Sequence, residues 1–293
     1  MRWDTVILDA IGTNDEEEID MKKLTKALKR ADMAEPDWLN ENKALLKACM
    51  NNNYKVAQIL LMVEGIDVNQ SDDDWTRLSS PLFMACLLRH LEVVHLLLAV
   101  PGIQVNQANG QGETPLLVAS QQGFLGCVHL LLRAKGIQIN QATNKGATPL
   151  FAACQHGHLS IVNALLNFDP RDDDKYDAES LRQRQTVDIN KGPGKLTPLD
   201  VAIGNKHWDI VVRLEDIPSV KKPSYKRDEG YIRARNKANV LQMLRKKVTE
   251  RHRTKPGGGD LATILGRQGH FLPKPVETSG TYMQFVKKES LKL

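Results

Sequence analysis

The sequence lacks long hydrophobic runs, and its few cysteines lie far apart. No apolar stretch approaches the roughly 20 residues that a membrane-spanning helix needs, and Asp4 and Asp9 interrupt the start, where a secretory signal would be apolar. The four cysteines form no Cys-x-x-Cys pair, which argues against a zinc site or a disulfide framework. We therefore expect a cytoplasmic or nuclear protein with reduced thiols, no metal and no other cofactor.

Residue patterns typical of enzymes are also missing. The triple glycine at 257–259 is not followed by Gly-Lys-Ser/Thr, so it is not a phosphate-binding loop. The acidic runs that start at Asp15, Asp72 and Asp172 lack the alternating spacing and the glycine of a calcium loop. We predict no catalytic residues and do not expect an enzyme.

Acidic and basic residues are unevenly distributed along the chain. From Pro218 onward the chain has 18 Lys and Arg and 6 Asp and Glu, which gives a net charge of +12. The preceding 217 residues have 22 Lys and Arg and 29 Asp and Glu, which gives a net charge of −7. Such a basic end is typical of a tail that meets an acidic partner, nucleic acid or an anionic surface.

An internal repeat dominates the middle of the chain. Segments starting at Ser79, Glu113 and Ala147 align without gaps, and Pro81, Pro115 and Pro149 recur every 34 residues. A fixed period of this length indicates stacked supersecondary units that bury their apolar faces against one another.

The residues of one unit predict a helix-turn-helix. Thr114 can cap a helix and Pro115 suits its first turn. Gly123 ends this short helix, and residues 125–134 carry Val and Leu at helical spacing. Gly136 breaks the second helix, and an extended arm with a tight turn leads into the next unit.

These units resemble the ankyrin repeat. The family's histidine after Thr-Pro-Leu is replaced by Phe83, Leu117, Phe151 and Asp200, which questions the usual Thr–His hydrogen bond but not the stacking. The resemblance implies an all-α ankyrin-repeat solenoid of helix-turn-helix units with short hairpin-like arms, followed by a C-terminal helix and an extended basic tail. The positions that carry it are Gly146, Thr148, Pro149, Leu150, Ala152, Ala153, Gly157, His158, Val162, Leu165 and Leu166.

The repeat pattern suggests the domain boundaries. A degenerate N-terminal capping repeat is expected at 1–40, and ankyrin repeats at 41–217. A linker with a basic amphipathic helix follows at 218–253, and a flexible basic tail at 254–293. Within the ankyrin region the expected units are 41–70, 71–107, 108–141, 142–190 with an insertion at 169–185, and 191–217.

Ankyrin repeats usually contact other proteins through the concave face, formed by arm tips and exposed inner-helix positions. Trp75, Leu87 and Leu88 stand out as apolar anchors, although packing within the repeats explains them equally well. The residues that the resemblance places on this surface are Met50, Asn51, Asp73, Asp74, Trp75, Thr76, Leu87, Leu88, Gln111, Glu113, Gln121, Gln122, Asn144, Lys145, Gln155 and His156.

The basic helix allows two interpretations. Its apolar stripe can cap the last repeat. Leu241, Gln242, Lys246, Lys247 and Arg251 also loosely resemble the IQ motif that binds calmodulin-like proteins. The basic residues that could contact a partner are Arg233, Arg235, Lys237, Arg245, Lys246, Lys247 and Arg251.

The leading hypothesis is a non-enzymatic scaffold or adaptor. It would bind a protein through the concave ankyrin surface, with the basic C-terminal tail as a second contact. The alternatives are binding of nucleic acid or another polyanion through the basic helix, and regulation by a calmodulin-like protein at the IQ-like segment.

Overall fold

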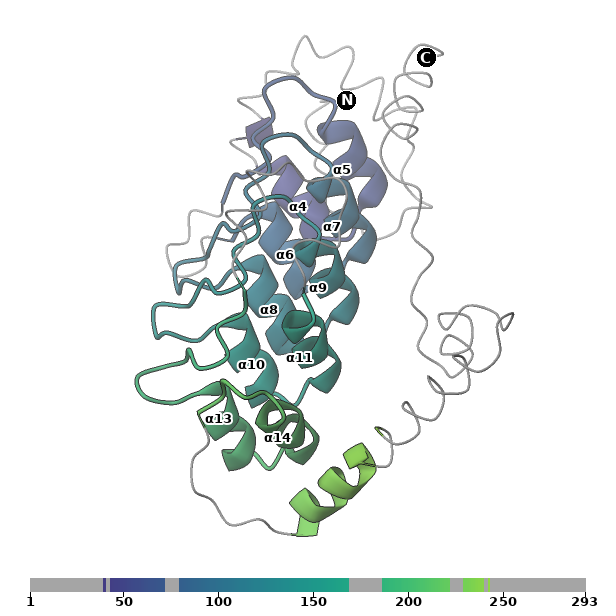
Figure 1. Cartoon of the computed structure of the whole chain (residues 1–293). Helices are drawn as coiled ribbons and strands as arrows, with labels where there is room; N and C mark the ends of the chain where they lie inside the picture. Colours follow the sequence, from purple (N-terminus) through teal and green to yellow (C-terminus); the bar gives the residue numbers. More distant parts are fainter. Residues whose placement is uncertain are drawn as a thin grey trace, which may run out of the picture. The chain divides into compact units, whose positions relative to one another are not determined.

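The computed structural model describes residues 39–40, 43–71, 79–168, 186–221, 229–239 and 242. Unit Met1–Ala238 holds all the repeats, and only residues 239 and 242 of unit Asn239–Leu293 are described. Five helix pairs, numbered here as repeats 1 to 5, follow one another in the first unit (Figure 1). They are α4 (Ala44–Met50) with α5 (Tyr54–Leu60), α6 (Pro81–Leu87) with α7 (Leu91–Leu98), α8 (Pro115–Gln122) with α9 (Leu125–Leu132), α10 (Pro149–Gln155) with α11 (Leu159–Leu166), and α13 (Pro198–Gly204) with α14 (Trp208–Glu215).

The helix pairs stack into two rows. The inner row is α4, α6, α8, α10 and α13, and the outer row is α5, α7, α9, α11 and α14 (Figure 1). The predicted all-α repeat solenoid is confirmed, and no strand occurs in the described part of the chain. None of the described helices combines the length and apolar character needed to span a bilayer.

A hydroxyl residue caps four of the inner helices. The side chains of Ser80, Thr114, Thr148 and Thr197 each accept a hydrogen bond from the backbone N–H of the third residue of the helix that follows. Proline occupies the first helical position in all four, where it needs no N–H partner. The Thr/Ser-Pro-Leu pattern therefore produces the helix starts that it predicts.

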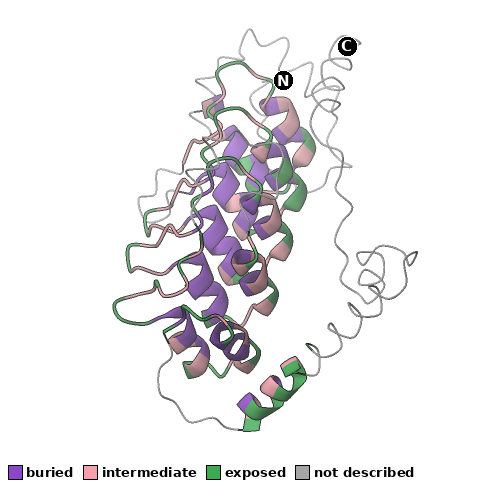
Figure 2. Ribbon diagram, in the orientation of Figure 1, coloured by how far each residue is buried: buried purple, intermediate pink, exposed green. Residues whose placement is uncertain are grey.

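The core runs continuously through the stack. The inner helices are buried along most of their length, whereas the exposed residues of the outer helices face away from them (Figure 2). Val94, Val128, Val162 and Val211 occupy equivalent outer-helix positions and are fully buried. Each repeat thus buries its apolar face against its neighbours, as a solenoid requires.

Asparagine side chains tie successive arms together. Asn106 donates from Nδ2 to the carbonyl of Gly136 (2.7 Å) and accepts at Oδ1 from the N–H of Gln138 (2.9 Å). Asn140 pairs in the same way with Thr186 and Asp188. Because Thr186 directly follows the segment 169–185, the ladder continues across the expected insertion. Asn40, Asn69 and Asn190 form the same two-bond pairing with the next unit.

The ladder extends one step beyond the last helix pair. Asn190 bonds to the carbonyl of Ser219 and the N–H of Lys221, two residues that the sequence analysis assigned to the linker. In the sequence, the next asparagine position is held by Pro223. Proline has no side-chain amide to continue the pairing.

Histidines join the repeats at the opposite edge, where each inner helix turns into its outer helix. The Nε2 atoms of His90, His158 and His207 lie 2.9–3.1 Å from backbone carbonyl oxygens of the preceding repeat. A Cβ at Gly123 would lie 2.7 Å from the His158 ring. In repeat 3 the same position is Phe124, over which the Arg89 guanidinium lies at 5.7 Å.

Candidate partner-binding groove

A groove of about 600 Å³ lies between the arms of repeats 3 to 5 and the inner helices α8 and α10. Its walls are arm 3 (residues 106–113), arm 4 (residues 140–147) and arm 5 (residues 190–196), which lead into α8, α10 and α13. Six residues that the sequence analysis assigned to a partner-binding surface line it: Gln111, Glu113, Gln121, Asn144, Lys145 and Gln155. The fold therefore brings together residues that are far apart in the sequence.

The groove has an apolar floor. Leu117 and Phe151 line it and are only 2% and 4% exposed. Both occupy the position after Thr-Pro-Leu where the ankyrin pattern has histidine. Leu196, on arm 5, also lines the groove and is 54% exposed. Replacing the family's histidine thus gives this groove apolar side chains in place of imidazole.

The rim is rich in carboxamides. Gln121 and Gln155 lie at the ends of α8 and α10, and Gln111 and Asn144 lie on the arms. The backbone carbonyls of Gln121 and Gln155 are held by His158 and His207 of the next repeats. Carboxamides both donate and accept hydrogen bonds without carrying charge, so the rim suits a neutral polar ligand such as a peptide main chain.

Hydrogen bonds close the joint between arms 3 and 4. The Asn144 backbone N–H donates to the Gln111 carbonyl and its Nδ2 donates to the Gly110 carbonyl, both at 3.0 Å. This contact requires glycine at 112, because a Cβ there would lie 2.6 Å from Asn144 Oδ1 and 2.7 Å from its backbone nitrogen. Gly112 also has a φ of 78°, which favours glycine.

The joint between arms 4 and 5 is open at the same place. Pro193 lies nearest to Gly146, as Asn144 lies nearest to Gly112. Proline has no backbone N–H and no side-chain amide, and the carbonyls of Asn144 and Lys145 accept no hydrogen bond from any described residue. The two arms are joined further back, where Thr148 Oγ1 donates to the Lys191 carbonyl (3.2 Å).

Arm 5 nevertheless lies close to the groove floor. A Cβ at Gly192 would lie 2.6 Å from Cδ2 of Phe151, so only glycine fits there without movement. Pro193 and Leu196 of this arm line the groove, as do Leu117 and Phe151. These four residues were not among the site residues predicted from the sequence. The available signals were the apolar replacements after Thr-Pro-Leu and the proline at the arm tip.

The other predicted partner-binding residues lie outside this groove. Met50 and Leu88 are 40% and 41% exposed at the turns of repeats 1 and 2, and Leu87 beside them is half-buried. The residues at the corresponding turns of repeats 3 and 4, Gln122 and His156, are exposed. Asn51 is half-buried. Asp73, Asp74, Trp75 and Thr76 lie outside the described residues.

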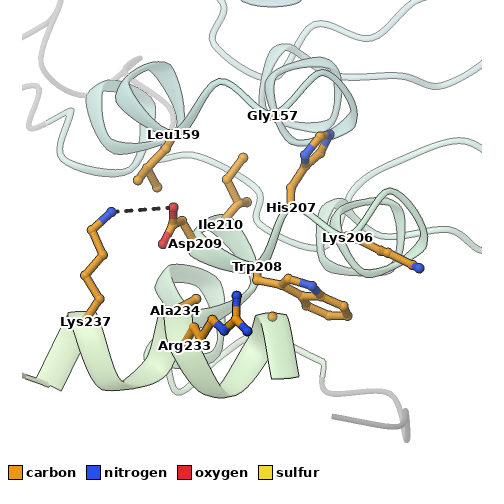
Figure 3. Close-up of a pocket in the computed structure, with 11 residues that line it drawn as sticks. Gly157, Leu159, Lys206, His207, Trp208, Asp209, Ile210, Arg233, Ala234 and Lys237 are labelled. Carbon is orange, nitrogen blue, oxygen red and sulfur yellow. Dashed lines mark ion pairs between the residues drawn. The ribbon is translucent and has the colours of Figure 1, made fainter. Parts of the chain in front are cut away.

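The helix at 229–239 packs against α14 (Figure 3). Tyr231, which is buried, donates from its hydroxyl to Glu215 Oε2 (2.7 Å) and packs edge-on against the Trp208 ring. Ala234 is also buried. Tyr231 and Ala234 of this helix therefore face the last repeat, whereas Ile232 is exposed.

Its described basic residues meet carboxylates. Lys237 lies 3.9 Å from Asp209, Arg235 pairs with Asp216 at 2.5 Å, and Arg233 pairs with Glu229 within the helix at 3.2 Å. These pairs are largely exposed and contribute little to stability. The other residues assigned to a basic contact, Arg245, Lys246, Lys247 and Arg251, lie outside the described residues, as does most of the IQ-like segment.

The cysteines are packed in the core. All four are free and buried. Burial raises the pKa of the Cys49 and Cys154 thiols well above the usual range, which disfavours the reactive thiolate. Among the described residues, no group of three or more His, Cys, Asp or Glu is arranged to hold a metal ion.

Comparison with protein families identifies the repeats. A family model described as ankyrin repeats (3 copies) matches residues 17–109 and 82–178, which together cover more than half of the chain. Comparison with curated proteins finds no match.

Proposed function

The chain belongs to the ankyrin-repeat family, and we propose that it acts as a non-enzymatic scaffold or adaptor that binds another protein through the groove of repeats 3 to 5. Ankyrin repeats generally mediate protein–protein interaction, through surface positions that vary while the core is kept. One observation carries the assignment: six residues chosen by their repeat positions line a single groove with an apolar floor and a polar rim. This is the composition of an interaction site.

A second contact through the basic C-terminal region remains part of the proposal. The net charge of +12 from Pro218 onward suits an acidic partner. Arg235 and Lys237 already face carboxylates of the last repeat, Asp216 and Asp209, which favours a capping role for the helix at 229–239. The second contact is therefore assigned to the basic residues further along. The four buried, free cysteines support a reducing compartment, cytoplasmic or nuclear.

The proposal is tested by affinity capture from a lysate of the source cells. The bait is the full chain, either unchanged or carrying Gln121→Arg with Gln155→Arg, which places two charges on the groove rim. The matched control is Ser160→Arg, an exposed position on α11 that does not line the groove. We expect recovery of the partner to fall about tenfold or more with the groove variant and to be unchanged with the control.

The same capture at raised salt distinguishes binding through the groove from binding through the basic tail. Retention of the partner at moderate salt with loss on the groove variant supports the groove. A partner that binds the groove variant normally but is lost at moderate salt, or on removal of residues 254–293, would assign the function to the basic tail.

A further inference from the structure

We propose that the groove binds an extended peptide segment of the partner, and that this segment pairs its main chain with arm 4 and inserts one aliphatic side chain toward Leu117 and Phe151. The inference rests on the proposed function, because it names the class of partner that the groove takes. It follows from two departures of this chain from the ankyrin pattern, one on the arms and one on the inner helices.

The first departure concerns hydrogen bonds between arm tips, which join arms 3 and 4 but not arms 4 and 5. Arm 4 donates to arm 3 through the backbone and side chain of Asn144. Arm 5 does not repeat this toward arm 4, because Pro193 lies at the equivalent place. The carbonyls of Asn144 and Lys145 are thus left without a donor among the described residues, at residues that line the groove. An extended peptide supplies backbone N–H donors at such an edge.

The second departure makes the floor apolar. Leu117 and Phe151 replace the histidine of the ankyrin pattern, and Ala152 lies beside them in the groove lining. Leu196 adds an exposed apolar side chain from the open joint. A side chain that packs on this floor loses water on the side that faces Leu117, Phe151 and Leu196, which favours leucine, isoleucine or valine over a polar residue.

The charges of the lining argue against an ionic ligand. Among the described residues that line it, only Glu113 and Lys145 are acidic or basic, and Glu113 already accepts a hydrogen bond from Asn109 Nδ2 (2.8 Å). The other polar side chains are the carboxamides Gln111, Gln121, Asn144 and Gln155 and the hydroxyl of Thr143. Uncharged groups of this kind bind peptide main chain and provide no net attraction for a polyanion.

The probe is a displayed library of random linear peptides, selected on the full chain. A selected peptide is then synthesised with a fluorophore, and its affinity is measured by fluorescence anisotropy. Two variants test the two departures separately: Leu196→Lys changes the apolar wall, and Pro193→Asn restores the donor groups that Asn144 provides on arm 4. Ser160→Arg is the control, and Pro193→Ala, which restores only the N–H, is a second variant of the arm.

We expect the selected peptides to share one aliphatic residue and to lose about tenfold or more in affinity on Leu196→Lys and on Pro193→Asn. Methylation of a backbone nitrogen beside the aliphatic residue should weaken binding to a similar degree, because it removes the donor. Ser160→Arg should leave the affinity unchanged. Helicity and the urea midpoint of each variant verify that it is folded.

Two results would overturn the peptide assignment. One is a selection that yields no binder above background, and the other is peptides that bind the Leu196 and Pro193 variants as well as the unchanged chain. After either result, the capture experiment still tests whether the groove binds a partner protein. A captured protein that still depends on Gln121 and Gln155 would then bind as a folded surface, and the proposed function would stand without the peptide.

Discussion

The joints between repeats 3 and 4 and between repeats 4 and 5 are built from the same elements but differ at the arms. In the first joint, Asn144 spans the gap with two hydrogen bonds and presses against Gly112. In the second, Pro193 takes that place and forms neither bond. The helices stack in both joints, so stacking does not need the arms to pair at their tips. An arm that is not paired there is available to a partner.

The largest expected effect on stability comes from replacing the glycines at the two joints, Gly112 and Gly146. Gly112→Ala adds a Cβ 2.7 Å from the Asn144 backbone nitrogen at a φ of 78°, so the arm must shift and its hydrogen bonds weaken. We expect the free energy of unfolding to fall by about 3 kcal/mol. Gly146→Ala has a similar φ but no contact closer than 3.4 Å, so about 1 kcal/mol is expected. Urea titration of both variants measures the difference, and equal losses would contradict a closed first joint.

A smaller effect concerns the threonines that begin the inner helices. Thr114→Val removes a helix cap and should reduce the free energy of unfolding by about 1 kcal/mol. Thr148→Val removes the same cap and also the hydrogen bond to the Lys191 carbonyl, which holds arm 5. We expect a loss of about 2 kcal/mol for Thr148→Val. Thermal unfolding followed by circular dichroism compares them, with Thr148→Ser as the control that keeps the hydroxyl. Equal effects of the two valine variants would show that Thr148 does not hold arm 5.

The smallest effects should come from the arm tips themselves. Asn144→Ala keeps the backbone N–H but loses the bond to the Gly110 carbonyl, at a cost of about 1 kcal/mol. Pro193→Ala keeps the backbone carbonyl that accepts from the Leu196 N–H and removes no other hydrogen bond of the described residues, so it should change stability by no more than about 0.5 kcal/mol. Amide hydrogen exchange in arms 3 and 4 should accelerate in the first variant only. Faster exchange in both would mean that Pro193 supports the arms in a way that its contacts do not indicate.

The fold could be predicted from the sequence because the repeats carry their own local signals. Ser/Thr-Pro-Leu marks the starts of four inner helices, with a spacing of 34 residues between the first three and 49 before the last, and the structure has the corresponding caps at Ser80, Thr114, Thr148 and Thr197. The two-bond asparagine pairing depends on one residue per unit. Its continuation from Asn190 to Ser219 and Lys221 was not foreseen, because those residues belong to no recognisable repeat.

The candidate site could be predicted only in part. Alignment of the repeats identified Gln111, Gln121, Asn144 and Gln155 as surface positions, and they share one groove. Alignment could not show that Pro193 interrupts the arm pairing, because arm 5 is one residue shorter between its asparagine and threonine than arms 3 and 4. The exposure of Leu196 likewise depends on how this shortened arm turns.

The central claim is that the open joint between arms 4 and 5 is where a partner binds. Its most direct test places a photo-reactive amino acid at Leu196 in the full chain, and separately at Ser160 on α11, followed by irradiation in a lysate of the source cells. Leu196 is 54% exposed in the groove lining and Ser160 is exposed away from it, so both positions tolerate the change. The account predicts one discrete protein adduct from position 196 that is absent from position 160. The same adduct from both positions, or an adduct from position 160 alone, would contradict it.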